Sequence, residues 1–173
     1  MLSQQKDTII LAKLIMQHQK WVHWVAFGLG SGTAPKAPGT IGSLAALLTL
    51  PVFAWLSLPW QVVWVVFAFA IGVWICDQTV RDLGVDDHPG IVWDEFVGIW
   101  VVFIAVPLTW ENIILGFLLF RIFDVLKPWP ISWLDRRVKG GFGVMVDDLL
   151  AGIIALAILQ LWLLSPWSAT LFG

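Results

Sequence analysis

Charged residues are confined to a few places in this chain, and no other feature constrains its fold as strongly. All ten Lys and Arg residues, and eleven of the twelve Asp and Glu residues, can be placed on one side of a membrane. Most of them lie in three clusters beside apolar segments, at residues 27–43, 77–95 and 121–148. Because charge beside hydrocarbon is costly and is seldom without a function, we expect a reaction centre at one membrane face.

The composition is typical of a membrane protein. Hydrophobic residues make up 59% of the chain and charged residues 13%, whereas soluble domains average about 25% charged residues. The net charge of −2 argues against a nucleic-acid partner, because nucleic-acid-binding domains carry a basic face. The single cysteine, Cys76, excludes an internal disulfide and a metal site built from cysteines.

Five apolar segments predict an all-α fold, a compact multi-helix integral membrane domain. Each segment is shorter than the ~20 residues that cross a bilayer comfortably, so we expect about five short transmembrane or re-entrant helices. Each also contains a glycine, which permits close packing of helices. The segments are residues 41–58, 60–76, 96–107, 113–126 and 149–164, and the glycines are Gly42, Gly72, Gly98, Gly116 and Gly152.

We expect residues 1–173 to form one domain, because the sequence shows no internal repeat and no linker. Residues 1–26, in which Lys13 interrupts an apolar stretch, are expected to be a cytosolic or interfacial lead-in helix rather than a signal peptide. Residues 27–165 are expected to form the catalytic helical core. A soluble all-α protein with very apolar helices is the alternative.

The distribution of basic residues predicts which membrane face carries the clusters. The connections at residues 57–59 and 109–112 contain no Lys or Arg, whereas the N-terminal arm and the other connections are rich in them. Loops rich in Lys and Arg remain in the cytoplasm. We therefore expect a multi-pass protein whose charged clusters, and so its active site, lie at the cytoplasmic face.

A glycine-rich stretch with several hydroxyl residues leads into the first apolar segment. We expect Thr40 to cap the N-terminus of a helix, where free backbone N–H groups can bind an anion. Lys36 adds a cation nearby, and Gly39 and Ser43 flank Thr40. The spacing matches neither the Walker motif nor the dinucleotide fingerprint. A phosphate site and a plain turn with a helix cap are therefore equally open.

Two pairs of adjacent acids, Asp94 with Glu95 and Asp147 with Asp148, open apolar helices. Adjacent helical residues point about 100° apart, so we expect at most one of Asp94 and Glu95 to face a given site directly. A helix N-terminus tolerates acids, which explains one acid of a pair but not both. Carboxylates at this depth are expected to have a divalent cation or an arginine as partner.

Arg121 and Asp124 are three residues apart and share a helix face, with Lys127 near it. A buried salt bridge is the simplest account, but burying two charges can cost more than their attraction returns. Carboxylate ligands suit Mg²⁺, which commonly takes one or two carboxylates together with water and substrate phosphate. The clusters together predict one or two Mg²⁺ ions beside a phosphate held by Arg and Lys, as hydrolysis of a phosphomonoester requires.

The three clusters contain an ordered set of motifs between residues 28 and 148. These are Gly28-x-Gly-x-Gly32, Ala37 to Ser43, Ile91 to Phe96, Phe120 to Asp124, Lys127 to Pro130, Gly140-Gly141 and Asp147-Asp148. In these motifs the chain resembles the phosphatidylglycerophosphatase A family. The resemblance implies a Mg²⁺-dependent lipid phosphatase of the bacterial inner membrane that converts phosphatidylglycerophosphate to phosphatidylglycerol. It also implies an all-α fold with a central helix ringed by others.

We assign three overlapping sets of candidate residues. The expected catalytic residues are Asp94, Arg121, Asp124 and Asp148. The expected metal ligands are Asp94, Glu95, Asp124, Asp147 and Asp148. The expected phosphate-binding residues are Lys36, Gly39, Thr40, Ser43, Arg121 and Lys127.

Other functional classes fit the sequence less well. It lacks the Cys and Arg separated by five residues of cysteine phosphatases, the Asp-x-Asp of haloacid-dehalogenase phosphatases and the Ser-Gly-His of lipid acid phosphatases. A small ion-coupled transporter or a noncatalytic membrane subunit is the alternative, although carriers place polar groups near the midplane and show internal repeats. The expected partners are a phospholipid substrate and membrane lipids, with no nucleic acid and no obligate protein partner.

Overall fold

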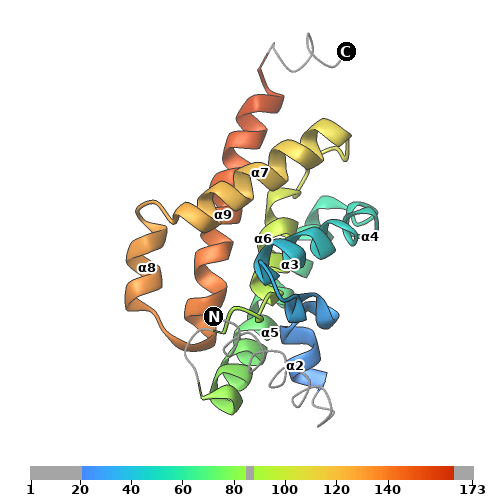
Figure 1. The fold of residues 1–173 in the computed structure, drawn as a ribbon. Helices are drawn as coiled ribbons and strands as arrows, with labels where there is room; N and C mark the ends of the chain where they lie inside the picture. Colours follow the sequence, from blue (N-terminus) through green and yellow to red (C-terminus); the bar gives the residue numbers. More distant parts are fainter. Residues whose placement is uncertain (1–20, 85–87, 166–173) are drawn as a thin grey trace.

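The structure, a computed structural model, describes residues 21–84 and 88–165 (Figure 1). It is helical, with no strand in these residues, so the predicted all-α fold is confirmed. Of the lead-in expected at residues 1–26, residues 1–20 lie outside the described residues and residues 21–26 form α2. The elements are α2 (Trp21–Ala26), the 3₁₀ helix η1 (Gly28–Thr33), α3 (Pro38–Leu47), α4 (Leu50–Ala54), α5 (Leu58–Leu83), α6 (Trp93–Val102), α7 (Trp110–Leu126), α8 (Ile131–Arg137) and α9 (Gly140–Leu163).

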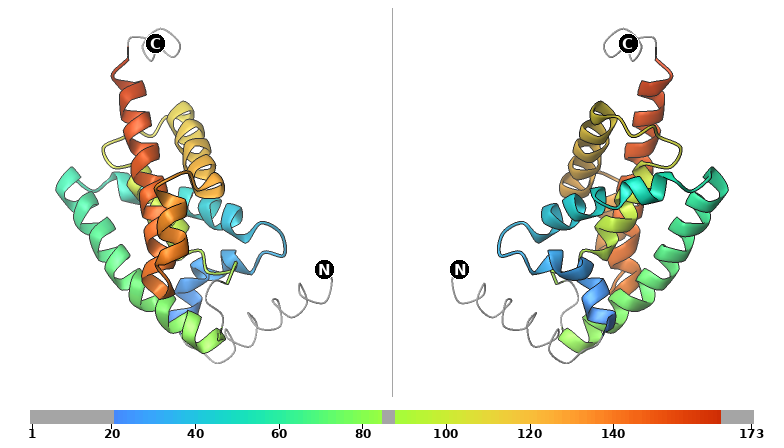
Figure 2. Two further views of the ribbon diagram at one scale, coloured as in Figure 1. Left: turned by 90° about the vertical axis from the view of Figure 1, so that its left-hand side faces the viewer. Right: turned by 90° about the vertical axis from the view of Figure 1, so that its right-hand side faces the viewer.

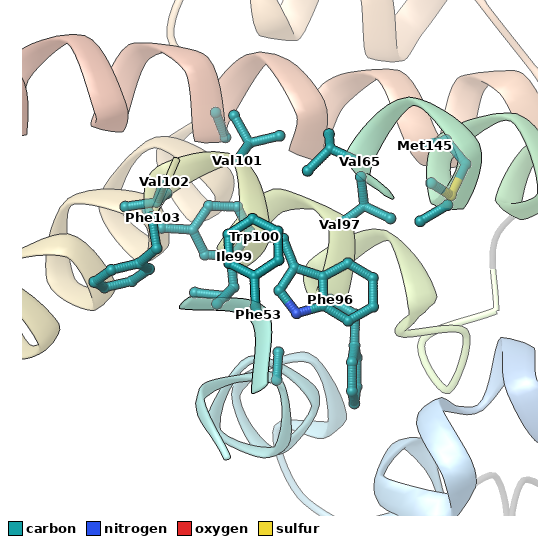
Figure 3. Packing of buried hydrophobic residues seen from close by; sticks show 14 of the residues in the cluster. Phe53, Val65, Phe96, Val97, Ile99, Trp100, Val101, Val102, Phe103 and Met145 are labelled. Carbon is teal, nitrogen blue, oxygen red and sulfur yellow. The ribbon is translucent and has the colours of Figure 1, made fainter. Parts of the chain in front are cut away.

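The short helix α6 lies at the centre of the fold. Every residue from Glu95 to Val102 is buried, and α3, α5, α7 and α9 all pack against this helix. Figure 3 shows its apolar side chains surrounded by residues of other helices, among them Phe53 of α4, Val65 of α5 and Met145 of α9. A helix that is apolar on all sides must be enclosed in this way. The fold thus has a central helix surrounded by other helices, which is the arrangement that the family resemblance implied.

Glycines allow the neighbouring helices to approach α6 closely. A Cβ atom on Gly152 of α9 would lie 2.7 Å from the carbonyl oxygen of Gly98 in α6. A Cβ atom on Gly98 would in turn lie 2.4 Å from the ring of Phe120 in α7. Gly72 of α5 leaves room in the same way for the ring of Trp93. The close approach predicted from one glycine in each apolar segment is confirmed at these positions.

The first apolar segment, residues 41–58, was expected to form one helix but is divided between α3, α4 and the start of α5. Helix α3 ends at Leu47 and α4 begins at Leu50, so neither is long enough to cross a membrane. Thr49 lies at this break, where its hydroxyl donates to the carbonyl oxygen of Ala46 and accepts a hydrogen bond from the indole of Trp100. Pro51, which has no backbone N–H, follows in the first turn of α4. The segment forms two short helices because the hydrogen bonds of Thr49 and the proline outweigh continuous apolarity, and whether it crosses or re-enters the membrane stays a prediction.

Among the described helices, two are long and apolar enough to cross a membrane, namely α5 and α9. The apolar window of α5 is only 28% buried, and its outer face exposes Val62, Val66 and Phe67. Both helices are consistent with a membrane protein. The expected number of about five spans stays a prediction, since α6 has 10 residues and is therefore about 15 Å long.

The second half of α5 lies against the beginning of α9. At Gly141 of α9, a Cβ atom would lie 2.1 Å from the carbonyl oxygen of Val73 in α5. The two helices diverge from this contact, and the other helices lie between them and beside them (Figure 2). Helix α2 is fixed to the same end of α5, because the ring nitrogens of the buried His23 lie 3.0 Å from the hydroxyl of Thr79 and 3.1 Å from the carboxylate of Asp82.

We expect the Gly152→Ala variant to lose stability, because its new methyl group would collide with the backbone of α6. Overpacking of this kind typically costs about 1–3 kcal/mol, which thermal unfolding in detergent would measure as a lower Tm. The control is Ala157→Val, which adds bulk at an exposed position of the same helix. An unchanged Tm for Gly152→Ala would show that α6 and α9 are not in the close contact described.

Candidate active site

A pocket of about 370 Å³ opens at the N-terminal end of α6. It lies among the start of α3, the end of α7, α8 and the first turns of α9, so elements far apart in sequence enclose it. Its ionisable lining consists of six carboxylates and three cations. The carboxylates are Asp94, Glu95, Asp124, Asp135, Asp147 and Asp148, and the cations are Arg121, Lys127 and Lys139.

Three carboxylates form the acidic centre of the pocket. One oxygen each from Asp94, Glu95 and Asp148 lies within 4.8 Å of the other two. The expectation that at most one of Asp94 and Glu95 faces the site is therefore wrong. Both residues line the pocket, because the longer glutamate side chain compensates for the different direction of its Cα–Cβ bond. Helix α6 contributes its first turn, whereas Asp148 lies more than two turns inside α9, because α9 begins at Gly140 and not beside Asp147 as expected.

The environment of these acids disfavours their charged forms. Burial raises the pKa of Glu95 to about 8, and the nearby carboxylate of Asp148 adds to the shift. Burial and the neighbouring Glu95 also raise the pKa of Asp94 well above its ordinary value. Oxygen Oε2 of Glu95 and Oδ2 of Asp148 are buried and have no hydrogen-bond partner among the described residues. Such oxygens require a proton or a cation, since a buried acceptor without a partner is costly.

Arg121 is held rigidly beside this centre. Its guanidinium donates to the carboxylate of Asp124, one turn further along α7, and lies 3.9 Å from Glu95. It also donates to the hydroxyls of Ser43 and Thr40 in α3, at 3.3 Å each. The hydroxyls of Ser43 and Thr40, which are expected to bind phosphate, therefore orient an arginine, and their contact with phosphate stays a prediction. Because several acceptors hold the guanidinium, it is a preorganised cation at the wall of the pocket.

Lys127 is the second fixed cation. It ends α7 in the left-handed conformation, with φ of 42°, and its ammonium donates to Asp147 and, at 2.7 Å, to Asp135. Burial lowers the pKa of Lys127, but the hydrogen bonds and charges of the two aspartates outweigh burial and raise it above its ordinary value. Lys127 thus stays protonated and neutralises Asp147, which the sequence had suggested as a metal ligand.

The donor set fits a hard divalent cation. All the candidate ligand atoms of Asp94, Glu95 and Asp148 are carboxylate oxygens, the type that Mg²⁺ prefers. With every carboxylate ionised, six carboxylates against three cations would give the pocket a formal charge of −3. A phosphate anion would be repelled from such a pocket unless a cation neutralised it first. The residues present therefore fit Mg²⁺, with Asp94, Glu95 and Asp148 as its closest ligands and Asp124 and Asp147 beside them.

The structure brings only part of the first cluster to the pocket. Gly39 lines it, and a Cβ atom there would lie 2.2 Å from Oε1 of Glu95, so the glycine lets α3 approach the acids. Lys36 is exposed and does not line the pocket. Thr40 was expected as the N-cap of α3, but Ala37 holds that position and Thr40 lies inside the first turn. The helix begins earlier because Pro38, whose φ already suits a helix, opens it.

The glycine-rich stretch before α3 packs against the loop that leads into α6. A Cβ atom on Gly32 would lie 2.0 Å from the carbonyl oxygen of Gly90, and Gly28 adopts a positive φ of 55° beside Val92. Among the described residues of this stretch, none before Pro38 lines the pocket. Its glycines allow close packing and a left-handed turn.

Sequence reasoning missed two residues of the pocket, Asp135 and Lys139. Asp135 lies on α8, a helix too short to be predicted from periodicity, and its carboxylate binds the ammonium of Lys127. Lys139, one of the basic residues after α8, lines the pocket and donates to the backbone carbonyl of Asp135. No sequence signal would have found these contacts, because they depend on how the chain turns after Lys127.

Comparisons with known proteins agree with the resemblance seen in the motifs. The family model described as phosphatidylglycerophosphatase A matches residues 24–163, a range that contains every residue lining the pocket. Phosphatidylglycerophosphatase A of Escherichia coli (strain K12) is 49% identical over 141 residues, which cover 79% of this chain and 80% of that protein. The protein of the same name from Haemophilus influenzae is 43% identical over 148 residues, covering 83% of this chain and 91% of that protein.

A more distant relative carries another name. A Bacteroides thetaiotaomicron protein named putative phosphatidylinositol-3-phosphatase is 38% identical over 139 residues, which cover 75% of this chain and 85% of that protein. No solved structure matches this chain.

The raised pKa of Glu95 predicts how pH affects the metal-free protein. The folded state holds a proton on Glu95 up to about pH 8, whereas the ordinary pKa of this side chain is 4.5. Stability from this group is therefore fully present below pH 4.5 and is lost as pH rises through about 8. We expect the Tm of the metal-free protein to decrease as the pH is raised from 4.5 to about 8. Added Mg²⁺ should increase the Tm more at pH 8 than at pH 4.5.

Glu95→Gln is the informative variant, because it keeps the shape of the side chain and removes its titration. Its Tm should vary less with pH than that of the wild type. Glu111→Gln, which removes an exposed carboxylate away from the pocket, is the control. A pH dependence as steep in Glu95→Gln as in the wild type would contradict the prediction.

Proposed function

The chain belongs to the phosphatidylglycerophosphatase A family, and we propose that it hydrolyses phosphatidylglycerophosphate to phosphatidylglycerol and phosphate in a Mg²⁺-dependent reaction. Membership of this family makes it a phosphoric monoester hydrolase. The observation that carries the metal-dependent reaction is the acidic centre, where three carboxylates converge and two of their buried oxygens have no partner.

Asp94, Glu95 and Asp148 would hold the cation in this reaction. When bound, Mg²⁺ polarises phosphate oxygens and acidifies the water that attacks phosphorus. The three residues are held in place before substrate arrives, because α6 and α9 are locked together at Gly98 and Gly152. Removal of a proton from the attacking water falls to a carboxylate of the pocket, since the pocket wall offers no histidine.

Arg121 and Lys127 would stabilise charge on the equatorial phosphate oxygens. Both cations are held in place by carboxylates, Arg121 by Asp124 and Lys127 by Asp135 and Asp147. Cations fixed in advance need no reorganisation as negative charge develops, which makes them effective in stabilising a transition state. The role of Asp124 in this proposal is to orient Arg121, in addition to any contact with the metal.

We propose that the pocket faces the cytoplasm of a bacterial cell. The end of α5 and the start of α9 lie at one end of the molecule, with α8 packed against α9 (Figure 1). Helix α8 carries Arg136 and Arg137, Lys139 directly precedes α9, and α8 and the first turns of α9 line the pocket. The connection between α6 and α7 lies towards the other end and has the exposed Trp110 beside it. A basic cytoplasmic end and aromatic residues at the interface are the pattern expected of a membrane protein.

We expect Asp148→Asn and Arg121→Ala each to lower kcat by roughly 10²–10³-fold, as loss of one charge-stabilising group does in other enzymes. The measurement is phosphate release from phosphatidylglycerophosphate in detergent micelles with Mg²⁺, with EDTA abolishing it. Glu111→Gln should keep full activity, because this exposed acid lies outside the pocket.

Near-normal activity of both variants would refute the assignment of the pocket as the active site. Phosphate release that is insensitive to EDTA would refute the metal while leaving the phosphatase intact. The absence of any phosphate release would favour a transporter or a noncatalytic subunit.

Cysteine labelling tests the proposed orientation. In inner-membrane spheroplasts, a membrane-impermeant maleimide should label Glu111→Cys directly and Arg136→Cys only after permeabilisation. The native Cys76 is fully buried and provides an unlabelled background. Direct labelling of Arg136→Cys would place the pocket on the outer side and contradict the proposal.

A further inference from the structure

The proposed substrate carries two phosphate groups, and the site described so far accounts for one of them. Phosphatidylglycerophosphate has a terminal phosphomonoester, which is cleaved, and a phosphodiester, which joins the same glycerol to the diacylglycerol. The phosphodiester keeps a negative charge throughout the reaction. It therefore needs a cationic partner at a short distance from the metal, on the side from which the lipid enters.

Two of the three cations of the pocket are already neutralised by protein carboxylates. Arg121 is paired with Asp124, and Lys127 is paired with Asp135 and Asp147. Lys139 differs from both. Its ammonium donates to a backbone carbonyl oxygen, that of Asp135 at 3.2 Å, and no carboxylate lies within salt-bridge distance of it among the residues that the structure describes.

Lys139 is also placed at the rim of the pocket. It is exposed and occupies the residue before α9, directly preceding Gly140 and four positions after Asp135. The carboxylate of Asp135 accepts a hydrogen bond from the ammonium of Lys127, and its backbone carbonyl oxygen accepts one from the ammonium of Lys139. Both ammonium groups therefore lie next to the same residue, Asp135. A lipid with two phosphates separated by one glycerol could thus reach both cations at the same time.

The other basic residues nearby are not placed in this way. Arg137 lies over the ring of Trp133, with its guanidinium carbon 4.9 Å from the ring centroid, and neither Arg136 nor Arg137 lines the pocket. Basic residues outside the pocket at this end of the protein can interact with anionic lipid headgroups. Lys139 is the basic residue of this group that contributes to the pocket wall.

We propose that Lys139 binds the phosphodiester of the substrate and so favours lipids in which a phosphodiester accompanies the phosphomonoester. This inference rests on the proposed function. Two of the three N–H groups of the ammonium are free to donate to the phosphodiester oxygens. Because the phosphodiester does not change in the reaction, the contact is made equally before and in the transition state, and its loss raises KM without lowering kcat.

The test compares Lys139→Gln with the wild type in micelles containing short-chain phosphatidylglycerophosphate and Mg²⁺. We expect KM to rise about tenfold, as for the loss of one charge-assisted hydrogen bond, with kcat unchanged. Lys139→Arg, which keeps the charge, should restore most of the affinity. Arg136→Gln removes the same charge outside the pocket and should leave both constants unchanged.

Two inhibitors separate the phosphodiester from the phosphomonoester. Short-chain phosphatidylglycerol carries only the phosphodiester, so Lys139→Gln should weaken its inhibition about tenfold, matching the change in KM. Inorganic phosphate resembles only the cleaved group, so its inhibition should not change.

Equal weakening of both inhibitors would overturn the proposal, because it would place Lys139 at the terminal phosphate. An unchanged KM, or the same rise in Arg136→Gln, would overturn it as well. These results leave the proposed function standing. If the wild type releases no phosphate from phosphatidylglycerophosphate, the proposed function fails, and this inference fails with it.

Discussion

The whole structure depends on enclosing a helix that begins with two acids. Helix α6 is apolar along its length and buried from Glu95 to Val102, so it must be surrounded by other helices. Enclosure leaves Asp94 and Glu95 with little access to water, and their charges must be matched from within the protein. The guanidinium of Arg121 compensates part of this negative charge, whereas the carboxylate of Asp148 increases it. The need for a proton or a cation at these acids is therefore a direct consequence of how the core is built.

The pocket divides its charges between two tasks. One set forms fixed pairs, Arg121 with Asp124 and Lys127 with its two aspartates. The other set, at the acidic centre, has oxygens that no protein group satisfies. Fixed pairs give precise positions to cations, while unsatisfied carboxylates give affinity for a metal. A site for a highly charged phosphate needs both, because neither cations nor metal alone would balance the substrate and the acids together.

The chemistry of the site was easier to predict from sequence than its geometry. Paired acids and an Arg121–Asp124 pair stand out because they interrupt apolar segments, where charge is rare. The partner of Lys127 could not be predicted, since Asp135 reaches it only through the turn that follows α7 and the short helix α8. Likewise, Thr40 carries the sequence signature of a helix cap, yet its hydroxyl accepts a hydrogen bond from Arg121. Local patterns identify residue types near a site, whereas tertiary contacts decide what each residue binds.

The enclosure of α6 also bears on how this fold tolerates change over evolution. Residues of α6 contact protein on every side, and Gly98 has no space even for a methyl group. The outer face of α5, by contrast, exposes Val62, Val66 and Phe67 away from the interior, where any apolar shape is acceptable. Substitutions should therefore accumulate on the outside of α5 and be rare in α6, although both helices contain long apolar stretches. Hydrophobicity alone would not distinguish the slowly diverging helix from the rapidly diverging one.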